Sequence, residues 1–135
     1  MKFVQLDDNA VIPTRATHGS AGYDLHALES ITIPPETHRL VKTGIGWEGM
    51  PENMVGFIWP KSGSSYKVGS DVLGGVIDSD YVRKDIGVIL RNNSSEPLVI
   101  KQADSIAQLV IQEFVVMPTD ITMDTREGGF GSTGK

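Results

Sequence analysis

The 135-residue chain contains no cysteine and no long apolar run. Without cysteine it has neither a disulfide framework nor thiolate chemistry, and this composition is compatible with a reducing compartment. No segment approaches the roughly 18 consecutive apolar residues of a membrane-spanning helix, and the N-terminus lacks the apolar stretch of a signal peptide. We therefore expect a soluble, intracellular protein of the cytoplasm, without a membrane partner.

An excess of basic residues is also missing. Twelve Lys and Arg stand against 17 Asp and Glu, and the formal net charge is −5 at pH 7. Non-specific binding to nucleic acid depends on a basic face, so we expect no direct nucleic-acid partner. The charge balance leaves a nucleotide ligand open, because a triphosphate needs only a few well-placed cations and a metal ion.

Glycine and proline, by contrast, are plentiful. Fifteen glycines and seven prolines are spread along the chain, and this is typical of a single domain with many short strands and turns. The sequence therefore predicts an all-β, mainly antiparallel fold. Apolar and β-branched runs predict strands at residues 3–6, 30–34, 37–43, 55–59, 86–91, 98–100 and 106–111. The last run is almost continuously apolar, as in a strand buried on both faces in a core or at a subunit interface.

The stretch from residue 71 to residue 87 carries the candidate catalytic groups. Its first half is a strand pattern interrupted by Gly74 and Gly75, and such glycines mark a bulge, a bend or a close approach to the backbone. On an extended chain Asp78 and Asp80 lie on one face and Tyr81 lies on the other. A carboxylate at the end of an apolar strand can take a proton from water beside a flat ligand that lies against the glycines.

This Asp-x-Asp pair has two other interpretations. An Asp at the end of a strand commonly serves a turn, because its side chain hydrogen-bonds nearby backbone N–H groups; this interpretation stays open. A calcium loop is excluded, because Tyr81, Val82 and Arg83 supply neither a third ligand nor the glycine that such a loop requires.

Residues 75–81, Gly-Val-Ile-Asp-Ser-Asp-Tyr, resemble the third motif of the trimeric deoxyuridine triphosphatases (dUTPases). Four other segments resemble the remaining motifs of that family in the same order, so the resemblance covers nearly the whole chain. It implies a distorted β-barrel or jelly roll over residues 1–117 with at most one short helix, and a flexible C-terminal arm over residues 118–135. It also implies a homotrimer whose active sites are shared between subunits.

In the third motif, the resemblance implies that Asp78 orients and deprotonates the water that attacks the α-phosphorus. The backbone between Val72 and Gly75, together with Val76, would recognise uracil through hydrogen bonds, and its tightness would reject a 5-methyl group. Tyr81 would lie under the sugar and reject a 2′-hydroxyl.

Residues 60–67 resemble the second motif. Pro60 stops a strand, and the Ser/Gly cluster after it presents donors to phosphate at the start of the one short helix that we expect. The resemblance implies that Lys61, Ser62 and Gly63 bind phosphate, with Ser62 at the oxygen between the α- and β-phosphates. The family usually has Arg at the position of Lys61, which is a point charge without a bidentate fork.

The first and fourth motifs are carried by Ala-Gly-Tyr-Asp-Leu-His-Ala and Ala-Asp-Ser-Ile-Ala-Gln-Leu. The resemblance implies that Asp24 lies in the outer shell of Mg²⁺ and that Gln108 lies near the phosphates and the catalytic water. The family commonly has Gly and Arg where this chain has Ala103 and Ser105. The connection at residues 82–85 is one residue longer than in the family, and we expect an enlarged hairpin loop or bulge there.

The C-terminal residues 129–135 satisfy most of a P-loop pattern, Gly-x-x-x-x-Gly-Lys. A P-loop follows a strand, continues with Ser or Thr and opens a helix. Because the sequence ends at Lys135, we expect no Walker-type NTPase.

The same tail resembles the fifth motif, with Arg126, Phe130, Gly131 and Ser132 as substrate-binding residues. A terminus of this composition is usually disordered. Phe130 can nevertheless stack on a base, while Arg126 and the hydroxyl groups close on the terminal phosphate. We expect disorder without ligand and closure over the site with it.

We therefore interpret the chain as an enzyme that hydrolyses dUTP to dUMP and pyrophosphate, limiting uracil in DNA and supplying dUMP, with Mg²⁺ held chiefly by the three phosphates. One alternative is a dCTP deaminase of the same fold, which needs an acid/base group, usually Glu, aimed at the cytosine ring; the uracil-recognising stretch contains no Glu. Another is a nucleotide-binding regulatory protein, against which the intact Asp78, Tyr81, Arg126 and Phe130 argue.

Overall fold

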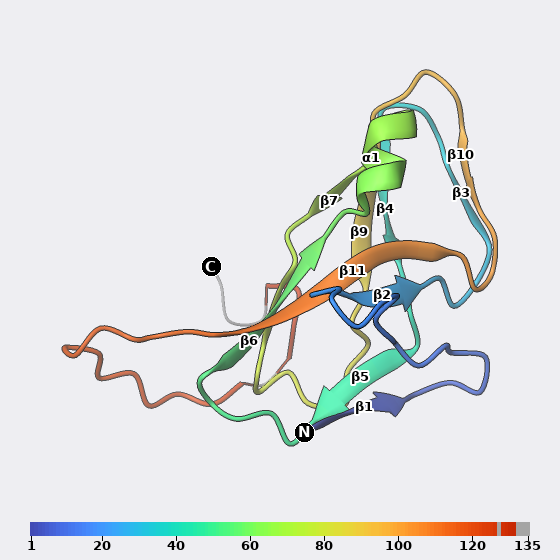
Figure 1. Cartoon of the computed structure of the whole chain (residues 1–135). Coiled ribbons are helices and arrows are strands. Elements are labelled where there is room, and N and C mark those ends of the chain that lie inside the picture. Colours follow the sequence, from blue (N-terminus) through green and yellow to red (C-terminus); the bar gives the residue numbers. More distant parts are fainter. Residues whose placement is uncertain (127, 132–135) are drawn as a thin grey trace.

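The computed structural model describes residues 1–126 and 128–131 of the chain. Strands predominate in this part, and one short helix accompanies them, so the expected all-β, mainly antiparallel class is confirmed (Figure 1). The elements are β1 (Lys2–Gln5), β2 (Tyr23–His26), β3 (Ile31–Ile33), β4 (Thr37–Val41), β5 (Ile45–Glu48), β6 (Met54–Trp59), α1 (Ser62–Val68), β7 (Asp71–Leu73), β8 (Val76–Asp78), β9 (Val88–Asn92), β10 (Leu98–Ile100) and β11 (Ser105–Glu113).

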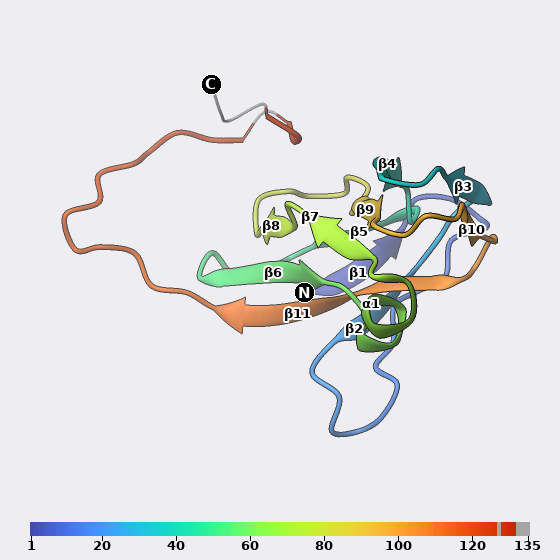
Figure 2. The same ribbon diagram turned by 90° about the horizontal axis from the view of Figure 1, so that it is seen from above.

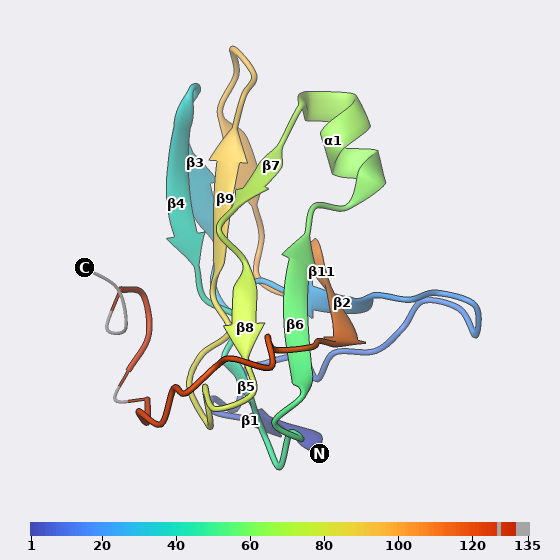
Figure 3. The same ribbon diagram turned by 90° about the vertical axis from the view of Figure 1, so that its left-hand side faces the viewer.

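The described strands form four sheets in which all the strand pairs are antiparallel. The largest sheet has the order β2-β11-β6-β8, and the next has the order β4-β9-β7. The pairs β1-β5 and β3-β10 complete the set. In Figures 2 and 3, β6 and β11 lie on one side of the molecule and β4 and β9 on the other. The two larger sheets thus face each other in the manner of a flattened barrel.

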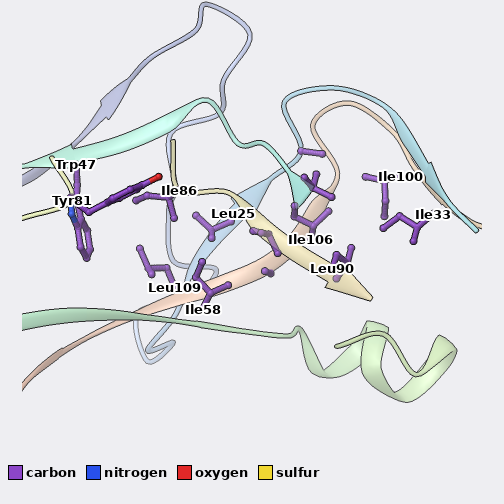
Figure 4. Close-up of a cluster of buried hydrophobic side chains, with 14 residues drawn as sticks. Leu25, Ile33, Trp47, Ile58, Tyr81, Ile86, Leu90, Ile100, Ile106 and Leu109 are labelled. Atoms are coloured by element: carbon purple, nitrogen blue, oxygen red, sulfur yellow. The ribbon is translucent and has the colours of Figure 1, made fainter. Parts of the chain in front are cut away.

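The space between these sheets holds the main hydrophobic core. Leu25 of β2, Trp47 of β5 and Leu109 of β11 are buried, as is Ile86 from the connection before β9. Figure 4 shows Trp47 and Tyr81 at one end of this cluster and Ile33 and Ile100 at the other. Strands from every sheet contribute, so the core joins the small sheets into one unit.

Strand β5 is an element that the sequence patterns do not predict, although it carries the fully buried Trp47. Glycines before, within and after it interrupt the strand pattern. Gly46 is required by packing, because a β-carbon there would lie 2.9 Å from the carbonyl oxygen of Lys84. The connection after β8 lies against this strand: the N–H groups of Arg83 and Ile86 donate to the carbonyls of Trp47 and Ile45 at 2.9 and 2.7 Å.

The Gly74-Gly75 pair marks the point where the chain passes from one sheet to another. β7 pairs with β9, whereas β8 pairs with β6. Both glycines have positive φ, 67° and 106°, a region that residues with a β-carbon rarely adopt. The predicted bend at the glycines is therefore confirmed.

The extended backbone predicted for Asp78 to Tyr81 is wrong. β8 ends at Asp78, and the N–H of Tyr81 donates to the carbonyl of Asp78 at 3.1 Å, which closes a turn. The expected hairpin loop or bulge at residues 82–85 is also wrong, because β8 and β9 belong to different sheets. The cause lies in the tertiary structure, because the connection is held by β5. The local sequence does not indicate this contact.

Other expected elements agree with the structure. β6 ends at Trp59, directly before Pro60, and α1 follows with Gly69 in left-handed conformation at its C-terminal end. In β11, Ile106 and Ala107 lie at a register shift and are both buried in the main core, while Val110 and Ile111 are only half-buried, so the expected burial of both faces is not seen in the single chain. No helix in the described ranges is long and apolar enough to cross a membrane.

After β11 the described residues run without helix or strand, first away from the sheets and then back towards β8 (Figures 1 and 3). Val115, Ile121 and Met123 in this segment are almost fully exposed. Contact with the body of the chain resumes at Arg126.

Replacing Gly56 with alanine tests the packing of β5 against the largest sheet. A β-carbon at Gly56 would lie 2.7 Å from Trp47 Cη2 and 2.8 Å from Leu109 Cδ1. Gly56→Ala should lower the free energy of unfolding by about 1–3 kcal/mol through overpacking. Denaturant unfolding measures the change. Gly19→Ala is the matched control, because a β-carbon at Gly19 meets nothing within 4 Å; equal stability of the two variants would contradict the packing argument.

Candidate functional site

A cavity of about 190 Å³ opens where the chain passes between the two larger sheets at Gly74 and Gly75. Ligand pockets for drug-sized molecules measure about 300–1,000 Å³, so this cavity fits a smaller group, such as a planar ring with an attached sugar. Six of the residues predicted from the sequence line it: Gly75, Val76, Asp78, Tyr81, Arg126 and Phe130.

Close backbone packing forms one wall of the cavity. The carbonyl of Gly75 accepts a hydrogen bond from the N–H of Ile58 at 2.8 Å. A β-carbon at Gly75 would lie 3.0 Å from the carbonyl oxygen of Ile58. Because its φ of 106° also excludes other side chains, only glycine allows the backbone itself to face the cavity.

Asp78 and Arg126 meet at the mouth of the cavity. Arg126 donates from Nη2 to the Asp78 carboxylate and from Nε to Asp80 Oδ1 at 2.7 Å. The hydrogen bond to Asp80 raises the pKa of the Arg126 guanidinium above its ordinary value. Both carboxylates thus face one guanidinium, even though the turn places them there rather than an extended strand.

Tyr81 also lines the cavity. Its hydroxyl donates to the backbone carbonyl of Asp85 at 2.7 Å, and the Arg126 guanidinium lies 5.9 Å from its ring centroid. Burial raises the pKa of Tyr81, and the charge of Asp85 acts in the same direction, while Arg126 opposes them. The phenol therefore stays protonated at neutral pH and keeps its ring fixed against the cavity.

A second group of predicted residues lies at the far end of β6. Lys61 Nζ is 2.5 Å from Asp24 Oδ1, and Gln108 Nε2 donates to the carbonyl of Pro60 at 3.2 Å. In the strand register, Gln108 lies opposite both Asp24 and Trp59. The largest sheet therefore gathers the residues of the first, second and fourth motifs.

The two groups do not meet within one chain. Asp78 lies opposite Val55 at the start of β6, whereas Gln108 lies opposite Trp59 at its end. Four residues along a strand and two strand spacings correspond to about 16 Å between their Cα atoms. A single water molecule cannot contact both side chains across that distance.

The remaining predicted residues are dispersed. Val72 lines a different cavity, on the side of Trp59 and Pro60. Ser62 and Gly63 lie in the first turn of α1. Gly131 is exposed with a φ of 104°, and Ser132 lies outside the described residues.

Sequence patterns alone miss several residues that line the cavity, among them Asp85 and Gly129. A β-carbon at Gly129 would collide with the Tyr81 ring, so this glycine lets the arm lie against Tyr81. The glycine run of the tail was a signal for such close contact. For Asp85 there is no local signal, because the partners of its carboxylate are more than 40 residues away.

No cluster of three or more His, Asp or Glu side chains able to hold a metal ion occurs among the described residues. Asp24 offers a single carboxylate, which already contacts Lys61. This donor set suits a cation that is held mainly by a bound ligand and touches the protein through water, and it does not suit a cation coordinated by protein side chains alone.

A family model described as dUTPase matches residues 8–134 of the chain. The chain belongs to the dUTPase family. The deoxyuridine 5′-triphosphate nucleotidohydrolase of Paramecium bursaria Chlorella virus 1 is 39% identical over 135 residues, which cover 96% of this chain and 94% of that protein. The enzyme of the same name from Monkeypox virus is 44% identical over 140 residues, covering 99% and 90% of the two chains.

Solved structures of dUTPases share the fold. A mutant dUTPase from phage phi11 of S. aureus, described as coordinating a structural Mg(II) ion, superposes with a TM-score of 0.81 at 23% identity, over 93% of this chain and 98% of that one. A mutant dUTPase of Staphylococcus bacteriophage 80alpha with bound dUpNHpp gives 0.79 at 22% identity, over 93% and 97%. These superpositions show that the chain shares the fold of solved dUTPases.

The raised pKa of Tyr81 predicts a loss of stability at alkaline pH. A folded-state pKa above the unfolded value of about 10 contributes stability that is fully present below pH 10 and is lost as the pH rises through the folded value. Denaturant unfolding at neutral pH and above pH 10 measures this loss, and Tyr81→Phe should make it smaller. Tyr66→Phe, at an exposed position, should lose as much stability at alkaline pH as the unmodified protein does. An equally large loss in Tyr81→Phe would contradict the assignment of this pH dependence to Tyr81.

Proposed function

We propose that this protein hydrolyses dUTP to dUMP and pyrophosphate through attack of water on the α-phosphorus. The observation that carries the proposal is the single cavity that Asp78, Gly75 and Tyr81 line together. The membership of the chain in the dUTPase family supports the same reaction.

The cavity holds the nucleoside part of the substrate. Backbone groups between Val72 and Val76 hydrogen-bond the uracil ring, and the close approach of Gly75 to Ile58 leaves the wall too rigid to yield to a 5-methyl group. Tyr81 lies under the deoxyribose, where a 2′-hydroxyl would be buried against its ring without a partner. An unpaired polar group in a site closed to water discriminates strongly.

Asp78 orients the attacking water and accepts its proton. Its side chain is 51% exposed at the mouth of the cavity, so water reaches it. Arg126 occupies this carboxylate in the structure and moves to the terminal phosphate when substrate binds, which releases the base. Phe130 then stacks on the uracil ring, and Gly131 and Ser132 complete the closed arm over the phosphates.

The phosphates are held by the second group of residues. Lys61 neutralises charge, Ser62 and Gly63 donate from the first turn of α1, and Gln108 contacts the phosphates and the attacking water. Asp24, whose carboxylate lies beside Lys61, would hold Mg²⁺ through a bound water molecule. When bound with the substrate, the ion would supply neutralisation of the charge on the three phosphates.

The active site is shared between subunits of a homotrimer. Asp78 and Gln108 serve the same water, yet the sheet separates them by about 16 Å in one chain. The groups therefore come from different subunits: residues 1–117 form the barrel, and residues 118–135 form an arm that closes over a shared site. The exposed apolar residues of the arm, such as Ile121 and Met123, are then covered by a neighbour.

The reaction itself is tested by following pyrophosphate release from dUTP, dCTP, dTTP and UTP with Mg²⁺, with ammonia measured in parallel. Rapid release from dUTP alone is expected. Ammonia from dCTP would instead place the protein among the deaminases. Binding of dUTP without any product would indicate a regulatory nucleotide-binding protein.

Asp78→Asn should abolish turnover and retain binding. Removing a general base costs about 10²–10⁴-fold in rate, whereas the amide keeps the shape of the side chain, so dUTP should still bind by calorimetry. Asp80→Asn is the matched control, because Arg126 binds that carboxylate too but Asp80 does not line the cavity. A near-normal rate for Asp78→Asn, or equal losses in both variants, would remove Asp78 from this role.

Deleting residues 126–135 should impair catalysis far more than folding. Arg126 forms two ion pairs to half-exposed carboxylates, so the free energy of unfolding should change by about 2 kcal/mol or less. The turnover of dUTP should fall by about 10²-fold, because closure over the substrate is lost. Arg126→Lys retains the arm and the charge without the bidentate fork. Its rate should lie between the rate of the unmodified protein and that of the truncated protein. An unchanged rate after truncation would assign the arm no catalytic role.

A further inference from the structure

Asp85 links the cavity wall to a distant part of the fold. It ends the connection after β8, at residues 82–85, which lies against β5 through the bridge between Val82 and Trp47 and the hydrogen bond from Arg83 to Trp47. This route leaves Asp85 between the β4–β5 corner and the cavity, which it also lines.

The carboxylate of Asp85 is bound to the β4–β5 corner. Oδ2 accepts from the N–H of Gly44 at 2.7 Å, and Oδ1 accepts from the N–H of Thr43 at 3.2 Å. Thr43 is buried, and its hydroxyl donates to the carbonyl of Ile86 at 3.0 Å, directly after Asp85. Hydrogen bonds from backbone amides to a carboxylate are charge-assisted and stronger than neutral ones, so they fix the loop at this residue.

The backbone carbonyl of Asp85 in turn binds the Tyr81 hydroxyl at 2.7 Å. Tyr81 is 8% exposed and lines the cavity together with Asp78. A tyrosine side chain has only two rotatable angles, so a hydrogen bond to its hydroxyl leaves the ring little freedom to move. The chain of contacts therefore runs from the corner at Thr43 and Gly44 through Asp85 to the ring of Tyr81.

We propose that Asp85 is a positioning residue which, by holding the Tyr81 ring through its own backbone carbonyl, sets how strongly the cavity discriminates deoxyribose from ribose. The inference rests on the proposed function, in which Tyr81 lies under the sugar. Asp85 does not itself transfer a proton in this role, because both oxygens of its carboxylate are engaged by backbone amides.

The test compares kcat/KM for dUTP and UTP in the unmodified protein and in Asp85→Asn, Asp85→Ala, Tyr81→Phe and the double variant Asp85→Asn/Tyr81→Phe. Loss of one hydrogen bond corresponds to about a three- to tenfold change. Asp85→Asn should lower the dUTP-to-UTP ratio by about this factor, and Asp85→Ala should lower it further. The double variant should lose little beyond Tyr81→Phe, because both changes break the same chain of contacts.

Asp7→Ala is the matched control. Asp7 also binds a backbone amide through its carboxylate, that of Asn9 at 2.8 Å, but it lies in a surface turn and does not line the nucleoside cavity. Its dUTP-to-UTP ratio should equal that of the unmodified protein. Circular dichroism and thermal unfolding identify any variant that fails to fold; if Asp85→Ala fails, Asp85→Asn and the double variant still decide the question.

Two results would overturn the inference: equal losses for dUTP and UTP in the Asp85 variants, or losses that simply add in the double variant. Failure of the proposed function gives a different result, namely no turnover of dUTP by the unmodified protein. In that case calorimetry on the same variants tests the positioning role, because it measures the ratio of the affinities for dUMP and UMP. An unchanged affinity ratio would then reject it.

Discussion

The register of β11 between β2 and β6 is the constraint on which the site depends. One strand places Gln108 beside Asp24 on one side and beside Trp59 on the other, and the chain then continues from Trp59 through Pro60 to Lys61. The other neighbour of β6 is β8, which brings Asp78 to the opposite end of the same sheet. Because strand spacing and rise per residue are nearly fixed, no choice of rotamers closes the gap of about 16 Å between the two groups. The same sheet carries both groups and keeps them apart, so the proposed function requires that the two groups of one active site come from different subunits.

The cavity itself arises where the chain leaves one sheet and enters the other. A crossing between sheets ends the regular ladder of hydrogen bonds, so backbone groups near Gly75 become available to a ligand while its carbonyl remains bound to Ile58. Positive φ at Gly74 and Gly75 makes this sharp crossing possible. In the proposed function, the same glycines that allow the chain to change sheets would also supply the surface that recognises the base, and any side chain at Gly75 would damage both.

The sequence supports prediction wherever the signal is local, and it fails where the cause is distant. The helix after Pro60, the bend at the glycines and the alternating strands follow from turn residues and apolar periodicity. β5 escapes prediction because Gly46, which interrupts its strand pattern, is required by contact with a loop nearly 40 residues later. The positions of Asp78 and Asp80 on one side were predicted for the wrong reason, since the turn closed by Tyr81 produces it. Asp85 could not be found at all, because its role depends on the route of a connection between two sheets.

The contacts of Arg126 explain how an arm can be both ordered against the cavity and easily displaced. Its guanidinium is held by Asp78 and Asp80, whose carboxylates are both about half exposed, and ion pairs of this kind contribute about 1 kcal/mol or less each. A triphosphate offers the same guanidinium a denser negative charge and a bidentate partner. Binding of such a ligand would therefore move Arg126 from carboxylate to phosphate at little cost and free Asp78 at the moment when a base is needed. In the proposed function, the weakness of this contact would couple closure of the arm to the exposure of the Asp78 carboxylate.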